Sequence, residues 1–316
     1  MKYQPPVDGD VDDPYITGDE ATGTEGSPVP GEAIEHTQRE VLAVIEGYGL
    51  TPDEADLAQM FKAIQKGIDD ISTAVNDITG LQISNNSTDA EHDIDIAPGR
   101  ARSADNTATL TLTATLTKQI DAAWTAGDDA GGMFTGSVAA DTTYHVFLIR
   151  KDSDGSIDAG IDVSATAANA PAGYTAYRRV GSVLTDASGN IMPFKIVGDF
   201  VRWTAPTQDV NASLGLTPTS YAIKTPLGLK LPAVIAFSGD QGTSGTLFGW
   251  VYSPDDSDPS TPSSSDHNYA TSGDAGTTSN HMMVQTNASS QVRAVYSTAA
   301  RPIYITTLGW IDRRDV

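Results

Sequence analysis

The chain has 316 residues, carries 41 Asp and Glu against 19 Lys and Arg, and contains no cysteine. A chain of this length is expected to form about two or three domains, without disulfides, a thiolate nucleophile or a Cys-ligated metal site. The formal net charge of −22 argues against nucleic acid and anionic membranes as partners, because binding to phosphates relies on clustered Lys and Arg.

Residues 1–33 are rich in Pro, Asp, Glu, Gly and Thr and hold few apolar side chains. Such a segment buries too little surface to offset the entropy lost on ordering. We interpret it as an extended acidic arm, which is either a disordered tail or a segment that becomes ordered on a neighbouring subunit. It has no apolar core of a signal peptide, and no run of about 18 apolar residues follows, so we expect neither signal-peptide export nor membrane insertion.

Residues 34–84 are predicted to be helical and to dock the chain on its partners. Apolar side chains recur every three or four residues from Ile34 to Ile45, and Gly47-Tyr48-Gly49 is typical of a helix end. A second helix is predicted to begin at Thr51, with Pro52 at its first helical position.

The second helix carries apolar residues spaced alternately by four and three residues, which is the pattern of a coiled-coil seam. The seam residues are Leu57, Phe61, Ile64, Ile68, Ile71, Val75 and Ile78. β-Branched residues at both core positions favour trimers or tetramers over dimers. We therefore predict a short parallel trimeric coiled coil; the alternative is an amphipathic helix packed on its own β domain.

From residue 85 onward the pattern changes to the period of two that is typical of strands, as in residues 108–117, where Thr alternates with apolar residues. A Pro-containing stretch near residue 205 suggests a boundary. The chain is thus predicted to be mainly β: the N-terminal arm, the helices with the coiled coil, and then two antiparallel β domains of sandwich or jelly-roll type. These domains cover residues 85–205 and 206–316, and the second is expected to be distal.

Residues 253–280 form a long predicted loop rich in Ser, Asp, Thr, Gly and Pro. Loops of this length are usually functional or disordered. Its charged and aromatic side chains are candidate receptor contacts, because they suit a sugar or protein surface. These candidates are Asp255, Asp256, Asp258, His267 and Tyr269.

Two parts of the sequence resemble known proteins. The segment EHTQREVLAVIEGYGLTP (residues 35–52), followed by DLAQMFKAI (56–64), resembles the N-terminal module of bacteriophage tail fibres and related virion appendages, including short fibres and spikes. Residues 141–149, 154–162, 171–182 and 308–312 resemble a stretch that recurs in phage and prophage virion proteins. Residues 204–307 carry no part of this resemblance.

The resemblance implies a virion component made in the host cytoplasm. It would be a homotrimer that contacts other virion proteins through its N-terminal region. A host cell-surface glycan or protein would be its receptor, bound weakly at each site and strongly by three sites together.

Motifs for catalysis are missing from the sequence. The five histidines lack metal-binding spacing, and neither a Gly-x-Ser-x-Gly elbow nor a phosphate-binding loop occurs. We therefore expect no cofactor and no enzyme activity. Asp152, Asp154 and Asp158 loosely resemble a calcium loop but lack the Glu at its twelfth position, and a hairpin turn is the favoured reading.

Three functions remain open from the sequence. The first is host adsorption by a tail fibre or spike. The second is a purely structural baseplate, neck or capsid-decorating fibre without host contact. The third is a glycan depolymerase spike, which needs two carboxylates in one sugar-binding groove.

Overall fold

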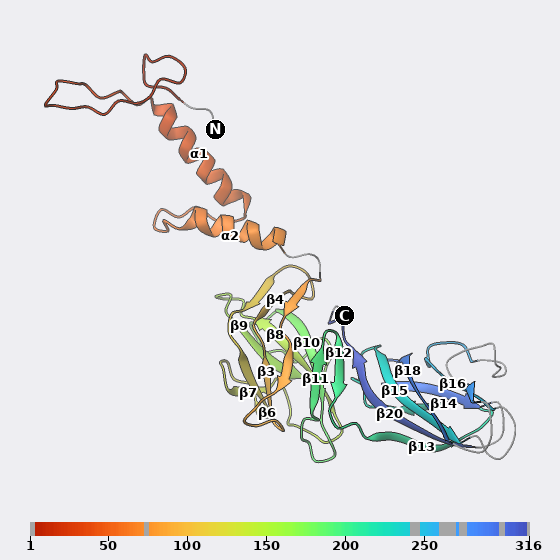
Figure 1. Cartoon of the computed structure of the whole chain (residues 1–316). Coiled ribbons are helices and arrows are strands. Elements are labelled where there is room, and N and C mark those ends of the chain that lie inside the picture. Colours follow the sequence, from red (N-terminus) through yellow and green to blue (C-terminus); the bar gives the residue numbers. More distant parts are fainter. Residues whose placement is uncertain are drawn as a thin grey trace. The chain divides into compact units, whose positions relative to one another are not determined.

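The computed structural model describes residues 4–72, 76–240, 247–258, 270–271, 277–296 and 301–314. The chain divides into two units, Met1–Ala74 and Val75–Val316, and each is described by itself. The described residues are mainly β with two N-terminal helices, as the sequence predicted (Figure 1).

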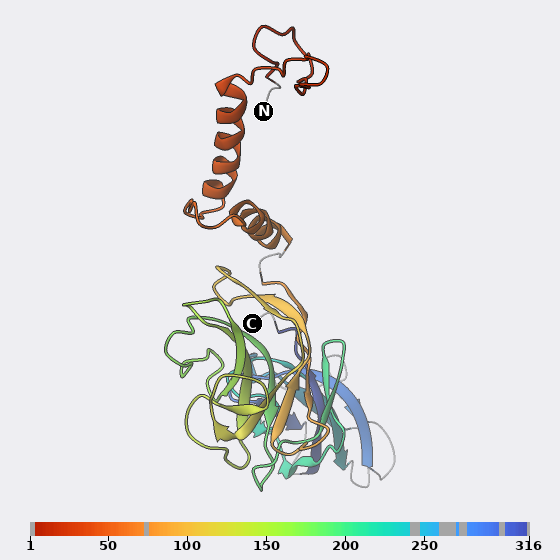
Figure 2. The ribbon, with the colours of Figure 1, turned by 90° about the vertical axis from the view of Figure 1, so that its left-hand side faces the viewer.

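The first unit holds the arm and both helices, α1 (Gly31–Gly47) and α2 (Gln59–Ser72). The arm forms loops ahead of α1 (Figure 2), and within it a bridge between Asp19 and Thr24 closes a short hairpin. Helix α1 ends where the glycines predicted, because Gly49 has a positive φ of 75° and donates to the carbonyl of Glu46.

Helix α2 starts later than the sequence predicted. The Asp53 side chain accepts from the backbone of Ala55, and Asp56 accepts from the backbone of Ala58. These turns replace helical hydrogen bonds over residues 51–58, so the helix begins at Gln59.

Two small residues of α2 allow it to approach α1 closely. Ala63 is fully buried, and a Cβ atom at Gly67 would lie 2.5 Å from Cζ of Tyr48. Gly67, a weak helix former, is therefore explained by packing. Neither helix is long and apolar enough to cross a membrane.

The largest sheet of the second unit has seven strands and curls into a nearly closed barrel. Its strand order is β10-β8-β9-β7-β6-β3-β2. The strands are β2 (Ile83–Asn85), β3 (Asp93–Ile96), β6 (Leu116–Ala123), β7 (Ala130–Met133), β8 (Thr143–Arg150), β9 (Ile157–Asp162) and β10 (Ala176–Leu184). Its two edges approach each other, because a Cβ atom at Gly181 in β10 would lie 2.6 Å from Cδ1 of Ile83 in β2.

The prediction of a purely antiparallel middle domain is wrong, because β7 runs parallel to both β6 and β9. Lys118 of β6 is completely buried, and its ammonium group donates to the carbonyls of Thr125 and Gly127. These bonds fold the β6–β7 connection back along β6. Ala130, the first residue of β7, therefore pairs with Lys118. A smaller sheet of β1 (Ile78–Gly80), β4 (Gly99–Arg102) and β5 (Thr109–Leu112) adds to the same core.

Two further sheets face each other across a second core. One contains β11 (Phe194–Val197), β12 (Phe200–Trp203), β13 (Gln208–Leu214), β15 (Pro232–Asp240), β18 (Thr277–Gln285) and β20 (Arg301–Ile311). The other contains β14 (Thr219–Ala222), β16 (Leu247–Tyr252), β17 (Ala270–Thr271) and β19 (Gln291–Tyr296). Phe237 and Ile305 from the first sheet meet Val251 and Val292 from the second.

Strand β20 belongs to both cores. Its Ile303 and Ile305 lie in the second core, whereas Trp310 lies in the first with its ring 5.0 Å from that of Trp203. The two β parts that the sequence separates near residue 205 are therefore joined by the last strand of the chain.

The N-terminal and C-terminal ends of the second unit lie close together. Arg178 of β10 donates to the carbonyls of Asn76 and Arg314. Next to it, Arg179 forms two hydrogen bonds with the carboxylate of Asp312, at 2.8 and 2.7 Å, and both side chains are 2% exposed. The C-terminal end of β20 is thus fastened to the barrel, away from β16 (Figure 1).

Candidate functional site

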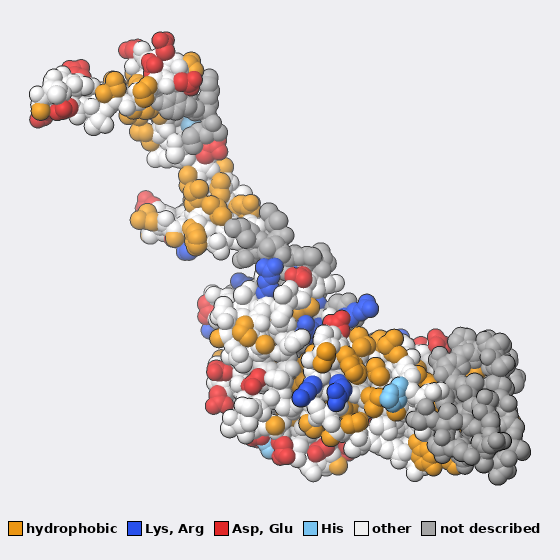
Figure 3. All heavy atoms as spheres, viewed as in Figure 1, with side chains coloured by type: hydrophobic (Ala, Val, Ile, Leu, Met, Phe, Trp, Pro, Cys, Tyr) orange, Lys and Arg blue, Asp and Glu red, His pale blue; other side chains and the backbone are white. Residues whose placement is uncertain are grey.

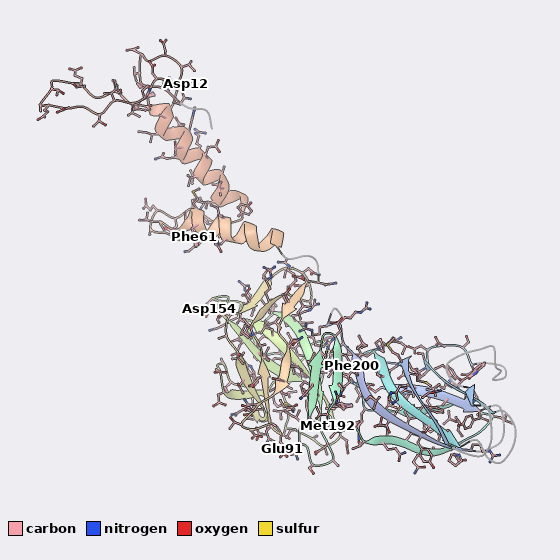
Figure 4. All side chains as sticks on the ribbon, in the orientation of Figure 1. Asp12, Phe61, Glu91, Asp154, Met192 and Phe200 are labelled. Carbon is pink, nitrogen blue, oxygen red and sulfur yellow. The ribbon has the colours of Figure 1, made fainter. Side chains whose placement is uncertain are left out.

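The structure places the predicted seam residues in three different settings. Phe61 and Ile64 lie on α2 and are 65% and 40% exposed, and Figure 4 shows Phe61 on this helix. Leu57 precedes the helix, and Ile78 lies in β1, where it packs against the barrel core. Ile68 and Ile71 lie in α2 with side chains outside the described set, and Val75 lies outside the described residues.

The predicted coiled-coil seam from Leu57 to Ile78 is therefore longer than helix α2. Within the helix, apolar residues separated alternately by three and four positions are limited to Phe61, Ile64, Ile68 and Ile71. Helix α2 buries Ala63, packs Gly67 against Tyr48 at the end of α1, and leaves Phe61 and Ile64 exposed. Such a face is expected to bind another surface, because exposing it costs hydrophobic free energy.

A second candidate site lies on the outer face of strands β16 and β19. Tyr252 and Arg293 are directly opposite each other across these strands. The Tyr252 hydroxyl donates to a carboxylate oxygen of Asp258 at 2.9 Å, and the Arg293 guanidinium lies 2.9 Å from the other oxygen. Trp250 and Val295 pack beside Tyr252 in a small apolar cluster. We call Tyr252, Asp258 and Arg293 the Tyr252 cluster.

The electrostatics of the Tyr252 cluster keep the phenol protonated. Burial, together with the hydrogen bond and negative charge of Asp258, raises the pKa of Tyr252 to about 12. Asp258 and Arg293 are partly exposed, with 42% and 29% of their side chains accessible to solvent, although Nε of Arg293 is buried. Tyr252 and Trp250 are only 9% and 7% exposed, so the groups that a ligand can reach are the Asp258 carboxylate and the Arg293 guanidinium. Such charged groups suit a polar ligand such as a sugar or a protein loop.

The structure places three of the five predicted receptor contacts. Asp258 belongs to the Tyr252 cluster, Asp255 forms a 2.8 Å ion pair with Lys230, and Asp256 is exposed. His267 and Tyr269 lie outside the described residues. Sequence analysis did not identify Arg293 and Lys230 as candidate site residues. Polar and apolar residues alternate at the start of β19, and this alternation is the signal that places Arg293 on the outer face of its strand.

The three carboxylates of the weak calcium candidate point to different partners. Asp158 lies 2.9 Å from the buried Lys118 ammonium, and Asp154 pairs with Lys151 at 3.1 Å. Asp152 accepts from the backbone and hydroxyl of Thr175. Gly155 has a φ of 76° in the turn that joins the antiparallel strands β8 and β9, so this segment is a hairpin. In the described part of the chain, no three His, Asp or Glu side chains gather as a metal site would require.

A pocket of about 240 Å³ lies on the barrel beside β8 and β10. Its lining residues are Asn76, Ala104, Phe147, Ala165, Thr166, Tyr177, Arg178 and Arg179. None of them is a carboxylate, so this pocket does not supply the acid pair that glycoside hydrolysis needs.

No protein-family model and no curated protein matches the chain. Its function is therefore inferred from its own residues and their geometry.

Proposed function

We propose that this chain is one subunit of a homotrimeric virion appendage of the short-fibre or spike type. Its N-terminal region contacts other virion proteins, and its C-terminal β part binds a glycan or protein on the host cell surface. Three weak sites on one particle component give strong adsorption, because every contact after the first is intramolecular. The chain carries out no turnover in this role.

The observation that supports this proposal most is the apolar face of α2. Phe61 and Ile64 are exposed at coiled-coil spacing, and Ile68 and Ile71 continue that spacing to the end of the helix. Three isoleucines in this series favour a trimer over a dimer. We assign α2 to a short parallel three-stranded coiled coil, and the two facing C-terminal sheets to the sandwich class.

The Tyr252 cluster is the surface that we assign to the receptor. It combines a buried tyrosine, which positions Asp258, with a carboxylate and a guanidinium that are partly open to solvent. Such charged groups bind polar ligands by charge-assisted hydrogen bonds.

The trimer is tested by measuring the mass of the purified chain by light scattering. We expect three times the 33.1 kDa of one chain, and a single-chain mass for the double variant Phe61→Asp, Ile64→Asp. Gln65→Asp, on an exposed polar position of the same helix, is the matched control and retains the wild-type mass. A wild-type chain with the mass of one subunit refutes the proposal.

Adsorption is tested with fluorescently labelled trimer on a panel of bacterial cells. We expect binding that Arg293→Ala weakens at least tenfold, while Asp154→Asn in the β8–β9 turn leaves it unchanged. A trimer that binds no cells supports instead a purely structural baseplate, neck or capsid-decorating fibre without host contact. Release of new reducing ends from surface glycans supports the depolymerase function.

A further inference from the structure

The outer face of the large C-terminal sheet has an unusual composition. On β11 and β12, Lys195, Val197, Phe200 and Arg202 lie opposite one another in register and point away from the core, because their neighbours Val201 and Trp203 are buried. Val234 of β15 and Met283 of β18 continue the same face across the sheet. We call these six outward residues the outer sheet face; Figure 4 labels Phe200 on it.

The outer sheet face is apolar where a solvent-facing antiparallel sheet is normally polar. Val197 is 70% exposed and Met283 is 62% exposed. Figure 3 shows hydrophobic side chains gathered over β12, β20 and β15, with Lys or Arg at one edge and a His at the other. Apolar patches bordered by polar groups usually mark an interaction surface.

The charge of this face is opposite to that of the chain. Its described outward side chains on β11, β12, β15, β18 and β20 include Lys195, Arg202 and His281 and no Asp or Glu. Within the described residues, neither Lys195 nor Arg202 forms an ion pair. On a chain with a net charge of −22, this is a local positive edge beside an apolar centre.

We propose that a second copy of this chain packs on the outer sheet face. The positive edge complements the acidic surface that every copy carries, so the occupant supplies carboxylates and buries the apolar centre. This proposal rests on the proposed trimer. Chains joined at α2 would also hold their β units at a high effective concentration, which favours further contacts between copies.

The symmetry of a ring fixes the kind of contact. In a three-fold ring each copy presents one surface to the next and a different surface to the previous one. The basic outer sheet face of one copy therefore meets an acidic surface of its neighbour, rather than the same face, where Lys195 and Arg202 would repel their counterparts. Three such contacts bury all three copies of the face.

The cysteine-free sequence allows a direct test on the full chain. A single Met283→Cys thiol reports whether the face is covered, and Leu216→Cys is the matched control, because Leu216 is 66% exposed on the β13–β14 connection. We expect a thiol reagent to label Met283→Cys at least tenfold more slowly than Leu216→Cys in the native trimer, and both at the same rate in urea. Equal native rates in a chain of trimer mass refute this inference and leave the trimer standing.

Repeating the labelling in a chain that cannot form the trimer shows whether a second copy covers the outer sheet face. In the Phe61→Asp, Ile64→Asp chain, we expect Met283→Cys to react as fast as Leu216→Cys, because the neighbouring copy is lost. Slow labelling in that single-chain form overturns the proposal, since the cover then belongs to the same chain. A wild-type chain with the mass of one subunit refutes the proposed trimer itself, so the two failures are distinguished by mass.

Discussion

Replacing Asp312 by Asn removes the negative charge from the ion pair that fastens the end of β20 to the barrel. Arg179 and Asp312 are each 2% exposed, and two hydrogen bonds join them. Burial alone raises the pKa of the Asp312 carboxyl, but the hydrogen bonds and positive charge of Arg179 outweigh burial and lower it below its usual value. The carboxylate is therefore charged in the folded chain at neutral pH.

The expected cost of Asp312→Asn is about 3–5 kcal/mol in the free energy of unfolding, because a guanidinium ion stays buried without its counter-charge. Asp154→Asn is the matched control. Asp154 also pairs with a cation, Lys151, but its side chain is 53% exposed, so we expect a far smaller loss than for Asp312→Asn. The double variant Arg179→Met, Asp312→Leu removes both charges of this buried pair and should be more stable than Asp312→Asn.

The assay is urea unfolding at pH 7, followed by the fluorescence of Trp203 and Trp310, which lie in contact in the first core. The extrapolated free energies of the four proteins are compared at constant m-value. Equal losses for Asp312→Asn and Asp154→Asn would refute the reasoning, because burial would then make no difference to the pair. A double variant less stable than Asp312→Asn would refute it as well.

Three further predictions concern the barrel. Burial and the charge of Arg179 lower the pKa of His145 from 6.5 to about 4. Between pH 6.5 and pH 4 the unfolded chain therefore binds a proton at His145 that the folded chain does not. The free energy of unfolding should fall by about 3 kcal/mol as the pH drops through this range, and His145→Gln should abolish that loss. Gly181→Ala should cost about 1–3 kcal/mol by overpacking against Ile83, and a thermal melt should show partial rescue by Ile83→Val. Lys118→Met should cost about 3–5 kcal/mol, because it leaves Asp158 buried and unpaired; a loss below about 1 kcal/mol in urea unfolding would contradict this.

Features encoded by neighbouring residues were predicted from the sequence. The end of α1 follows from Gly49, whose positive φ is open to glycine at no steric cost, and the mainly β class follows from alternating residues such as those of β5 and β6. The start of α2 was missed because Asp53 and Asp56 form side-chain turns that compete with helical bonds. The helical spacing was also extended too far, since Ile78 fits the seam pattern equally well as a residue of β1.

The sequence by itself determined the two helices, the strand-rich body and the acidity of the chain, because each of these depends on composition or on residues a few positions apart. Only the tertiary structure decided the parallel placement of β7, the closure of the barrel at Gly181, the Tyr252 cluster and the outer sheet face. These features join residues from distant strands, as Arg179 and Asp312 do across 133 positions. Which strands become neighbours depends on the burial of the whole chain, and that choice leaves no local pattern in the sequence.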